Sequence, residues 1–114
     1  MFNKEYRKSK RVRPNVTIEI VDIIKNIIIG SVLNISSEGL LVSTNLHIEA
    51  GLLFQTQWNF SARGLKSIDV GIECLWSETQ TSNIYLTGFQ IIDISKDDQD
   101  ILDRIIAQSK EIDD

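Results

Sequence analysis

The chain has 114 residues, of which 42% are hydrophobic and 25% charged, a composition typical of one globular domain with a modest core. Its single cysteine excludes an internal disulfide bond, and no apolar run approaches the roughly 18 residues that a membrane span requires. The net charge is −4, yet residues 1–13 hold six of the 12 basic residues and one acidic residue, so the rest of the chain is strongly acidic.

The basic segment 1–13 has little apolar content and no periodicity, so we expect a flexible arm that orders only when a ligand holds it. It lacks the apolar stretch of a secretory signal, and the lone cysteine fits a reducing compartment, so we expect a cytoplasmic protein with no membrane insertion. The acidic remainder would repel a nucleic acid polymer but not a small dianion at the arm. Pro14 marks the start of the folded region.

Six segments between residues 14 and 93 show strand patterns, with apolar residues alternating with polar ones or concentrated in short runs. Residues 68–76 alternate most regularly, and Gly30 interrupts the second segment as a possible bulge or close backbone approach. The strands are expected at 16–21, 27–33, 40–44, 52–60, 68–76 and 84–93, with a turn at 22–26 and polar loops that include 78–83.

A helix is predicted at residues 95–110. Ser95 and Asp98 form a capping-box pattern, and apolar residues at 101, 102, 105 and 106 share one face. Residues 111–114 are expected to fray. The sequence therefore predicts an all-β fold over residues 1–114. A six-stranded antiparallel β-barrel at 14–93 is followed by a C-terminal α-helix and preceded by the flexible basic arm.

The sequence gives little support for an enzyme. His47 is the only histidine, which excludes a histidine-based metal cluster, and it lies in a polar loop where we expect it to be solvated. Cys74 falls on the apolar face of a strand, where a thiol usually fills the core. Trp58 and Trp76 alternate with polar residues and are also predicted to be core. We therefore predict no catalytic residue, no metal and no cofactor.

Two polar motifs remain. Arg7 and Arg11 lie four residues apart in the basic arm, and arginine presents a planar set of donors that suits phosphate oxygens or a guanine edge. Asn34 and Ser36 alternate at the end of a strand, so their side chains are expected on one side, and Gly39 permits a tight turn. Together they suit a small phosphorylated guanine ligand.

The two motifs resemble the RxxxR and [D/N]xSxxG motifs of the PilZ domain family, the bacterial receptor module for cyclic di-GMP. The resemblance covers nearly the whole chain and extends to Val12, Ala50-Gly51, Trp76 and Gly88. It implies a six-stranded barrel with the ligand on its outer surface. It also implies that Arg7 and Arg11 grip phosphates and guanine edges, that Asn34 and Ser36 bond to a guanine, and that Gly39 lets the backbone approach.

Three positions depart from the family pattern. Asn34 replaces the common Asp and offers an uncharged acceptor, and Ile91 replaces a common Phe. Tyr6 stands where many members carry a further Arg, a position that in the family influences whether one ligand molecule or a stacked pair is bound. Tyr6 favours one molecule.

The leading hypothesis is a cyclic di-GMP sensor that orders its arm over the ligand and signals to a partner protein. The alternative is a ligand-independent adaptor that acts through protein contacts, in which the arginines simply pair with acids such as Glu38 or Asp69. A barrel that binds single-stranded nucleic acid ranks last, because only Phe2 and Tyr6 lie among the basic residues.

Overall fold

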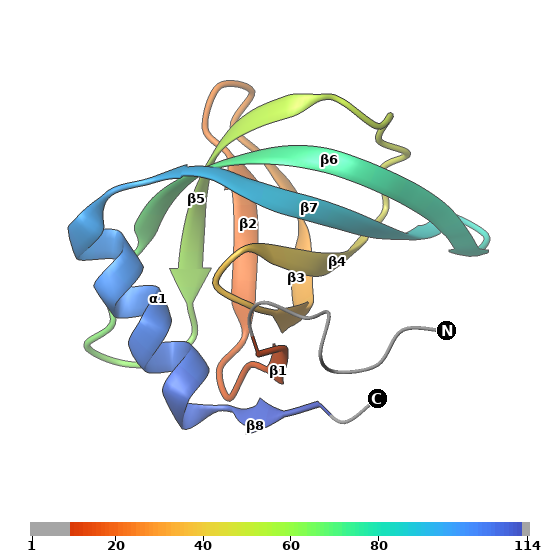
Figure 1. Cartoon of the computed structure of the whole chain (residues 1–114). Coiled ribbons are helices and arrows are strands. Elements are labelled where there is room, and N and C mark those ends of the chain that lie inside the picture. The colour runs from red at the N-terminus through yellow and green to blue at the C-terminus, as the bar shows by residue number, and fades with distance from the viewer. Residues whose placement is uncertain (1–9, 113–114) are drawn as a thin grey trace.

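The computed structural model describes residues 10–112. Six antiparallel strands form a closed barrel, because β2 pairs with β3 as well as with β5 (Figure 1). This confirms the predicted fold class. Around the barrel the order is β2 (Ile18–Asp22), β5 (Leu53–Phe60), β6 (Ile68–Thr81), β7 (Ile84–Ile94), β4 (Gly39–Thr44) and β3 (Ile27–Ile35).

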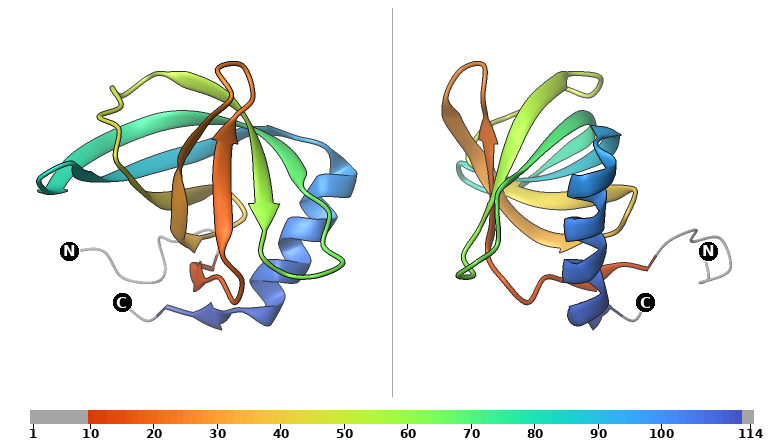
Figure 2. Two further views of the ribbon diagram at one scale, coloured as in Figure 1. Left: turned by 180° about the vertical axis from the view of Figure 1, so that it is seen from behind. Right: turned by 90° about the vertical axis from the view of Figure 1, so that its left-hand side faces the viewer.

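Two short strands that the sequence analysis missed extend the sheet beyond β3. Strand β1 (Val12–Arg13) pairs with β3, and β8 (Lys110–Glu111) pairs with β1, so the two ends of the described chain lie side by side (Figure 2). Residues 12 and 13 therefore belong to the sheet and not to the flexible arm predicted for 1–13, and Glu111, which was predicted to fray, lies in β8. Val12 explains the difference, because its side chain is 1% exposed and joins the core.

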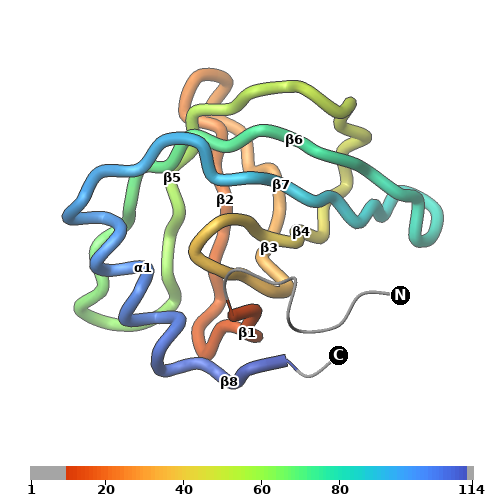
Figure 3. The backbone as a smooth tube through the Cα atoms, in the orientation of Figure 1, coloured from red at the N-terminus to blue at the C-terminus, as the bar shows by residue number. Residues whose placement is uncertain are grey.

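The hairpin between β6 and β7 corrects a second expectation. Residues 78–83 were predicted to form a polar loop, but β6 continues to Thr81 and β7 begins at Ile84. The reversal needs only Ser82 and Asn83, with Asn83 in the left-handed region at φ 65°. The backbone trace shows this hairpin reaching beyond the rest of the sheet, where both faces meet water and the strands can be polar (Figure 3).

The barrel interior holds the alternate apolar residues of the strands, as the patterns predicted. Trp58 is fully buried, and its indole Nε1 donates to Thr56 Oγ1 at 3.0 Å. The Thr56 hydroxyl in turn donates to the carbonyl oxygen of Val70 at 2.6 Å, so each polar group that Trp58 and Thr56 bring into the core has a partner. The prediction for Trp58 is confirmed, whereas Trp76 is 43% exposed and lies outside the core.

Helix α1 (Lys96–Gln108) begins at the predicted cap, where the backbone N–H of Asp98 donates to Ser95 Oγ at 3.2 Å. It is two residues shorter than predicted at its C-terminus, because Ser109 ends it and Lys110 enters β8. Leu102 and Ile105 are its buried residues. Within residues 10–112, no helix combines the length and apolar character that crossing a membrane would require.

Gly30 is a point of close backbone approach, as one of the two readings of the sequence expected. A Cβ built on Gly30 would overlap the carbonyl oxygen of Ser43 on β4. The Gly30→Ala substitution is therefore expected to lower the free energy of unfolding by about 1–3 kcal/mol through overpacking. Urea denaturation measures this loss. Ser31→Ala, at an exposed neighbouring position, is the control and should change stability far less. Equal effects of the two substitutions would contradict the packing argument.

Candidate functional site

The turn between β3 and β4 is built by Ser36. Its backbone N–H donates to the carbonyl oxygen of Gly39 at 2.9 Å. Its side-chain oxygen accepts from the backbone N–H groups of Glu38 and Gly39, both at 3.2 Å. Ser36 is only 8% exposed, so these bonds lie largely out of water. The same hydroxyl donates to the carbonyl oxygen of Gly39 at 3.5 Å, so both its lone pairs and, through a long bond, its proton are used inside the turn.

Gly39 is required by the neighbouring strand. A Cβ at this position would lie 2.7 Å from the carbonyl oxygen of Phe89 on β7, closer than real Cβ atoms come to backbone. Gly39 is paired with Gln90 at the start of β4, so the absence of a side chain allows β4 and β7 to pair directly beside the turn. Its first role in this structure is thus packing between strands.

Asn34 carries an acceptor without a partner. Its Oδ1 atom is buried and has no hydrogen bond in the part of the chain that the structure describes, where it is the one such side-chain atom. An unpaired buried acceptor costs about 1–3 kcal/mol, so it marks a position at which a donor is missing. Of the three residues of the second motif, Asn34 is the one that the fold leaves available.

A β-bulge determines where Asn34 points. Strands β3 and β4 pair Val32 with Val42 and then Asn34 with Leu41, so Leu33 is an extra residue in β3. Ile35 and its partner Leu40 point into the core. Asn34 therefore projects from the outer face of the barrel, as the resemblance implied for a ligand-binding residue. Bulges commonly re-aim a side chain in this way.

Arg11 lies beside this turn. Val12 pairs with Ile35 and points inward, so the antiparallel register places Arg11 across from Ser36 and Arg13 across from Asn34, both exposed. The structure thus brings Arg11 to the second motif and adds Arg13, which sequence reasoning did not assign to the site. Neither Glu38 nor Asp69 forms an ion pair with Arg11. Arg7 and Tyr6 lie outside the described residues.

Trp76 lies on the same outer face as Asn34, on the side away from Arg13. A Cβ on Gly88 would clash with the indole ring of Trp76, so the indole lies directly over Gly88 on the neighbouring strand. Pairing across β1, β3, β4, β7 and β6 gives one continuous outer row of residues: Arg13, Asn34, Leu41, Gly88 and Trp76. An exposed indole in this row offers a flat surface on which a base can stack.

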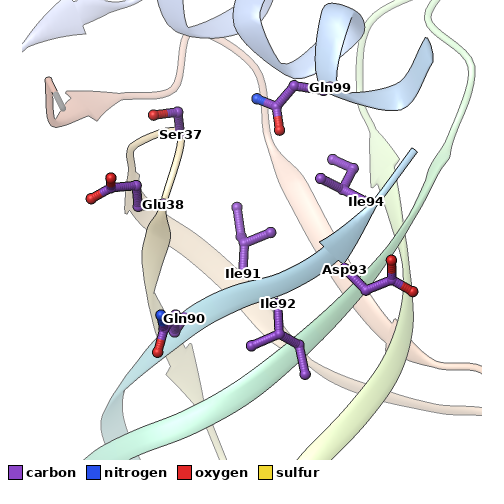
Figure 4. Close-up of a pocket in the computed structure, with 8 residues that line it drawn as sticks. All are labelled: Ser37, Glu38, Gln90, Ile91, Ile92, Asp93, Ile94 and Gln99. Carbon is purple, nitrogen blue, oxygen red and sulfur yellow. The ribbon is translucent and has the colours of Figure 1, made fainter. Parts of the chain in front are cut away.

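Two open grooves flank the motif turn, and Ser37 lines both. The first has a volume of about 520 Å³ and lies between the turn, the end of β7 and the start of α1 (Figure 4). The second, of about 540 Å³, lies between Lys10, Val12 and the end of α1. Both grooves lie beside the turn, and neither coincides with the outer row itself, which is open sheet surface.

Cys74 and His47, the other residue types that often take part in catalysis, have structural surroundings that explain them. Burial raises the pKa of the Cys74 thiol above its usual value, and the side chain is 1% exposed, so it is poorly suited to act as a nucleophile. His47 is exposed and packs edge-on against Tyr85, with ring centroids 5.5 Å apart. Within residues 10–112, no cluster of three or more His, Cys, Asp or Glu side chains could hold a metal ion.

These features describe a small antiparallel barrel with cationic side chains and a polar turn on its outer face. Residues 5–108 match the PilZ domain family, and the chain belongs to that family. The family membership that the sequence resemblance predicted is therefore confirmed. No curated protein sequence matches the chain.

Solved structures share the fold at low sequence identity. The Bacillus subtilis inhibitor of motility, MotI/DgrA, is 17% identical with a TM-score of 0.69, and the match covers 95% of this chain and 56% of that one. The PilZ domain of YcgR from Escherichia coli, in a structure with c-di-GMP, is 12% identical with a TM-score of 0.65 and 90% coverage of both chains. The chain thus spans about half of MotI/DgrA.

Substituting two residues of the second motif should change the stability of the ligand-free protein in different directions. Ser36→Ala leaves the N–H groups of Glu38 and Gly39 without their acceptor, so the free energy of unfolding should fall by about 1–3 kcal/mol. Asn34→Leu removes an unpaired buried acceptor, so stability without ligand should stay unchanged or rise by up to about 1 kcal/mol. Chemical denaturation of the ligand-free protein measures both changes, with Ser37→Ala as the control. A large loss of stability in Asn34→Leu would mean that Oδ1 has a structural partner.

Proposed function

We propose that this PilZ domain binds cyclic di-GMP without catalysing a reaction, and that it passes ligand occupancy to a partner protein in the cytoplasm. The observation that carries the proposal is the unpaired Oδ1 of Asn34, held on the outer face across from Arg13 and next to the Ser36 turn. Membership of the PilZ family supports it, as does the fold shared with a YcgR domain that was solved with c-di-GMP.

The ligand has two kinds of group to satisfy, and this outer face offers a complement for each. Guanine presents N–H donors on its base-pairing edge, and Asn34 Oδ1 is an acceptor already removed from water. We assign Arg7 and Arg11 to the phosphates and to a guanine edge or face, with Arg13 adding charge nearby. We assign the Ser36 hydroxyl to a guanine acceptor, which would replace its long 3.5 Å bond to the Gly39 carbonyl oxygen, while Gly39 keeps the backbone of the turn open to the ligand.

Binding is expected to order the arm. The described chain begins at Lys10, next to Arg11, which the register of β1 places across from Ser36, so the arm is joined to the chain directly beside the turn. Closing the arm costs conformational entropy, which charge-assisted hydrogen bonds of about 1.5–3 kcal/mol each can offset. The partner protein would then recognise a surface that exists only in the liganded state.

Calorimetric titration with cyclic di-GMP tests this function. We expect one ligand molecule per chain, as Tyr6 suggests, and a tenfold or greater loss of affinity in both Arg7→Ala and Arg11→Ala, since about 1.4 kcal/mol is one decade. Arg63→Ala, in the exposed loop between β5 and β6, removes the same charge away from the site and is the matched control. A wild-type protein that remains silent at high micromolar ligand would refute the proposal.

Trp76 provides a separate prediction. If a guanine stacks on its exposed indole, Trp76→Leu should weaken binding about tenfold or more, because stacking on an aromatic side chain contributes about 1–3 kcal/mol per base. Ligand should also quench the fluorescence of Trp76 but not of Trp58, which is buried in the barrel. Measuring quenching in Trp76→Leu isolates the Trp58 signal. Unchanged affinity together with unchanged fluorescence would remove Trp76 from the site.

The alternative function is a ligand-independent adaptor. The presence of Arg11, Asn34 and Ser36 at the site argues against an adaptor. In particular, protein contacts elsewhere on the barrel give no reason for the unpaired buried acceptor of Asn34. Amide hydrogen exchange distinguishes the two functions. Residues 1–13 should become protected when cyclic di-GMP is added to a sensor, and an adaptor should show the same exchange with and without the nucleotide.

A further inference from the structure

The tip of the β2–β3 hairpin carries four exposed isoleucines that the proposed ligand site does not use. Ile23, Ile24, Ile27 and Ile28, here called the isoleucine knob, are between 42% and 76% exposed. The knob projects from the barrel at the end opposite β8 (Figures 1 and 2). Large apolar side chains gathered on one exposed projection indicate a contact surface, since single exposed apolar residues need no such explanation.

The knob is rigid before it meets any partner. The buried carboxylate of Asp22 accepts hydrogen bonds from the backbone N–H groups of Ile24 at 2.9 Å and Lys25 at 3.2 Å. Asn26 occupies the left-handed region at φ 57°, which closes the turn. The N–H of Ile23 also donates to the carbonyl oxygen of Gln55 on β5 at 3.1 Å. A preorganised projection loses little conformational entropy on docking.

The charge of the knob restricts its occupant. Lys25 is the only charged residue between positions 23 and 30. The negative charge of Asp22 is buried under the turn, so the exposed tip is apolar with one positive charge. A bilayer is a poor match, because an anionic surface would repel a chain of net charge −4 and a single lysine offsets little of that. The complement is an apolar recess with an acidic rim.

The same chain contains a recess with two isoleucines in its floor and an acidic residue at each end. The groove of about 520 Å³ between the motif turn, β7 and α1 has Ile91 and Ile94 pointing into it, between Ser37 and Gln99 (Figure 4). Glu38 and Asp93 lie at its two ends, and the described residues that line it include no cation. The surface of the groove is otherwise mostly polar, so Ile91 and Ile94 offer the apolar contact for the knob and the acidic ends complement its lysine.

We propose that the isoleucine knob of one copy docks into this groove of a second copy. Two copies that each insert their knob into the other's groove form a two-fold symmetric pair, in which every knob and every groove is occupied. The ligand row lies on the outer face beside the groove and not inside it. The contact is therefore a second function of the barrel and does not depend on whether the chain binds a nucleotide.

Molecular mass in solution tests the pairing. Light scattering on ligand-free protein at high micromolar concentration is expected to give twice the 13.0 kDa of one chain. Ile24→Glu and Lys25→Glu should each raise the dissociation constant tenfold or more, and both sites are exposed, so thermal unfolding of the dilute variants should match the wild type. Lys66→Glu makes the same charge change in an exposed loop that belongs neither to the knob nor to the lining of the groove, and it should leave the mass unchanged.

A charge exchange identifies the groove. Asp93→Lys alone should weaken the pair about as much as Lys25→Glu, and the double variant Lys25→Glu with Asp93→Lys should recover most of the lost affinity. A wild-type protein that is monomeric throughout would overturn the proposal, as would a dimer indifferent to these changes or a double variant without recovery. Sedimentation with anionic vesicles that depends on Ile24 would also overturn it, because the knob would then be a lipid contact.

Discussion

Two β-bulges set the geometry of the outer face. Leu33 is inserted in β3 and Leu75 in β6, and after each insertion the next residue changes face. Without them, strict alternation would direct Asn34 and Trp76 into the barrel. With them, both side chains lie on the surface in the row that runs across five strands. The site therefore depends on two departures from regular pairing more than on any single side chain.

The three residues of the second motif differ in how many of their polar groups the fold itself uses. Ser36 closes the turn with its hydroxyl, and Gly39 allows β4 to pass beside the Phe89 carbonyl. Only Asn34 retains an unused acceptor in the described structure. Ser36 and Gly39 thus fix the backbone that carries Asn34. The turn has this shape in the ligand-free structure.

Much of the fold follows from the sequence because alternation reports directly which face of a strand is buried. That argument correctly identified six strands, the buried Trp58 and the cap of α1. It failed for Trp76, since the bulge at Leu75 is formed with β7 and leaves no local signal in the sequence. It also missed β1 and β8, because strands of two residues are too short to show a period, and it read the polar hairpin as a loop. Arg13 could have been found only from the register of β1 on β3.

Strand β3 also connects the two surfaces of the molecule. One end of its nine residues begins in the isoleucine knob, and the other ends at the motif turn, about 30 Å away at the usual rise per residue. The groove that matches the knob contains Ser37 and Glu38, which lie inside the motif turn between Ser36 and Gly39. A knob docked there would contact the backbone that positions the ligand acceptor. Pairing needs no nucleotide, but a ligand that changed this turn would shift the pairing equilibrium, and pairing would then change ligand affinity by the same factor.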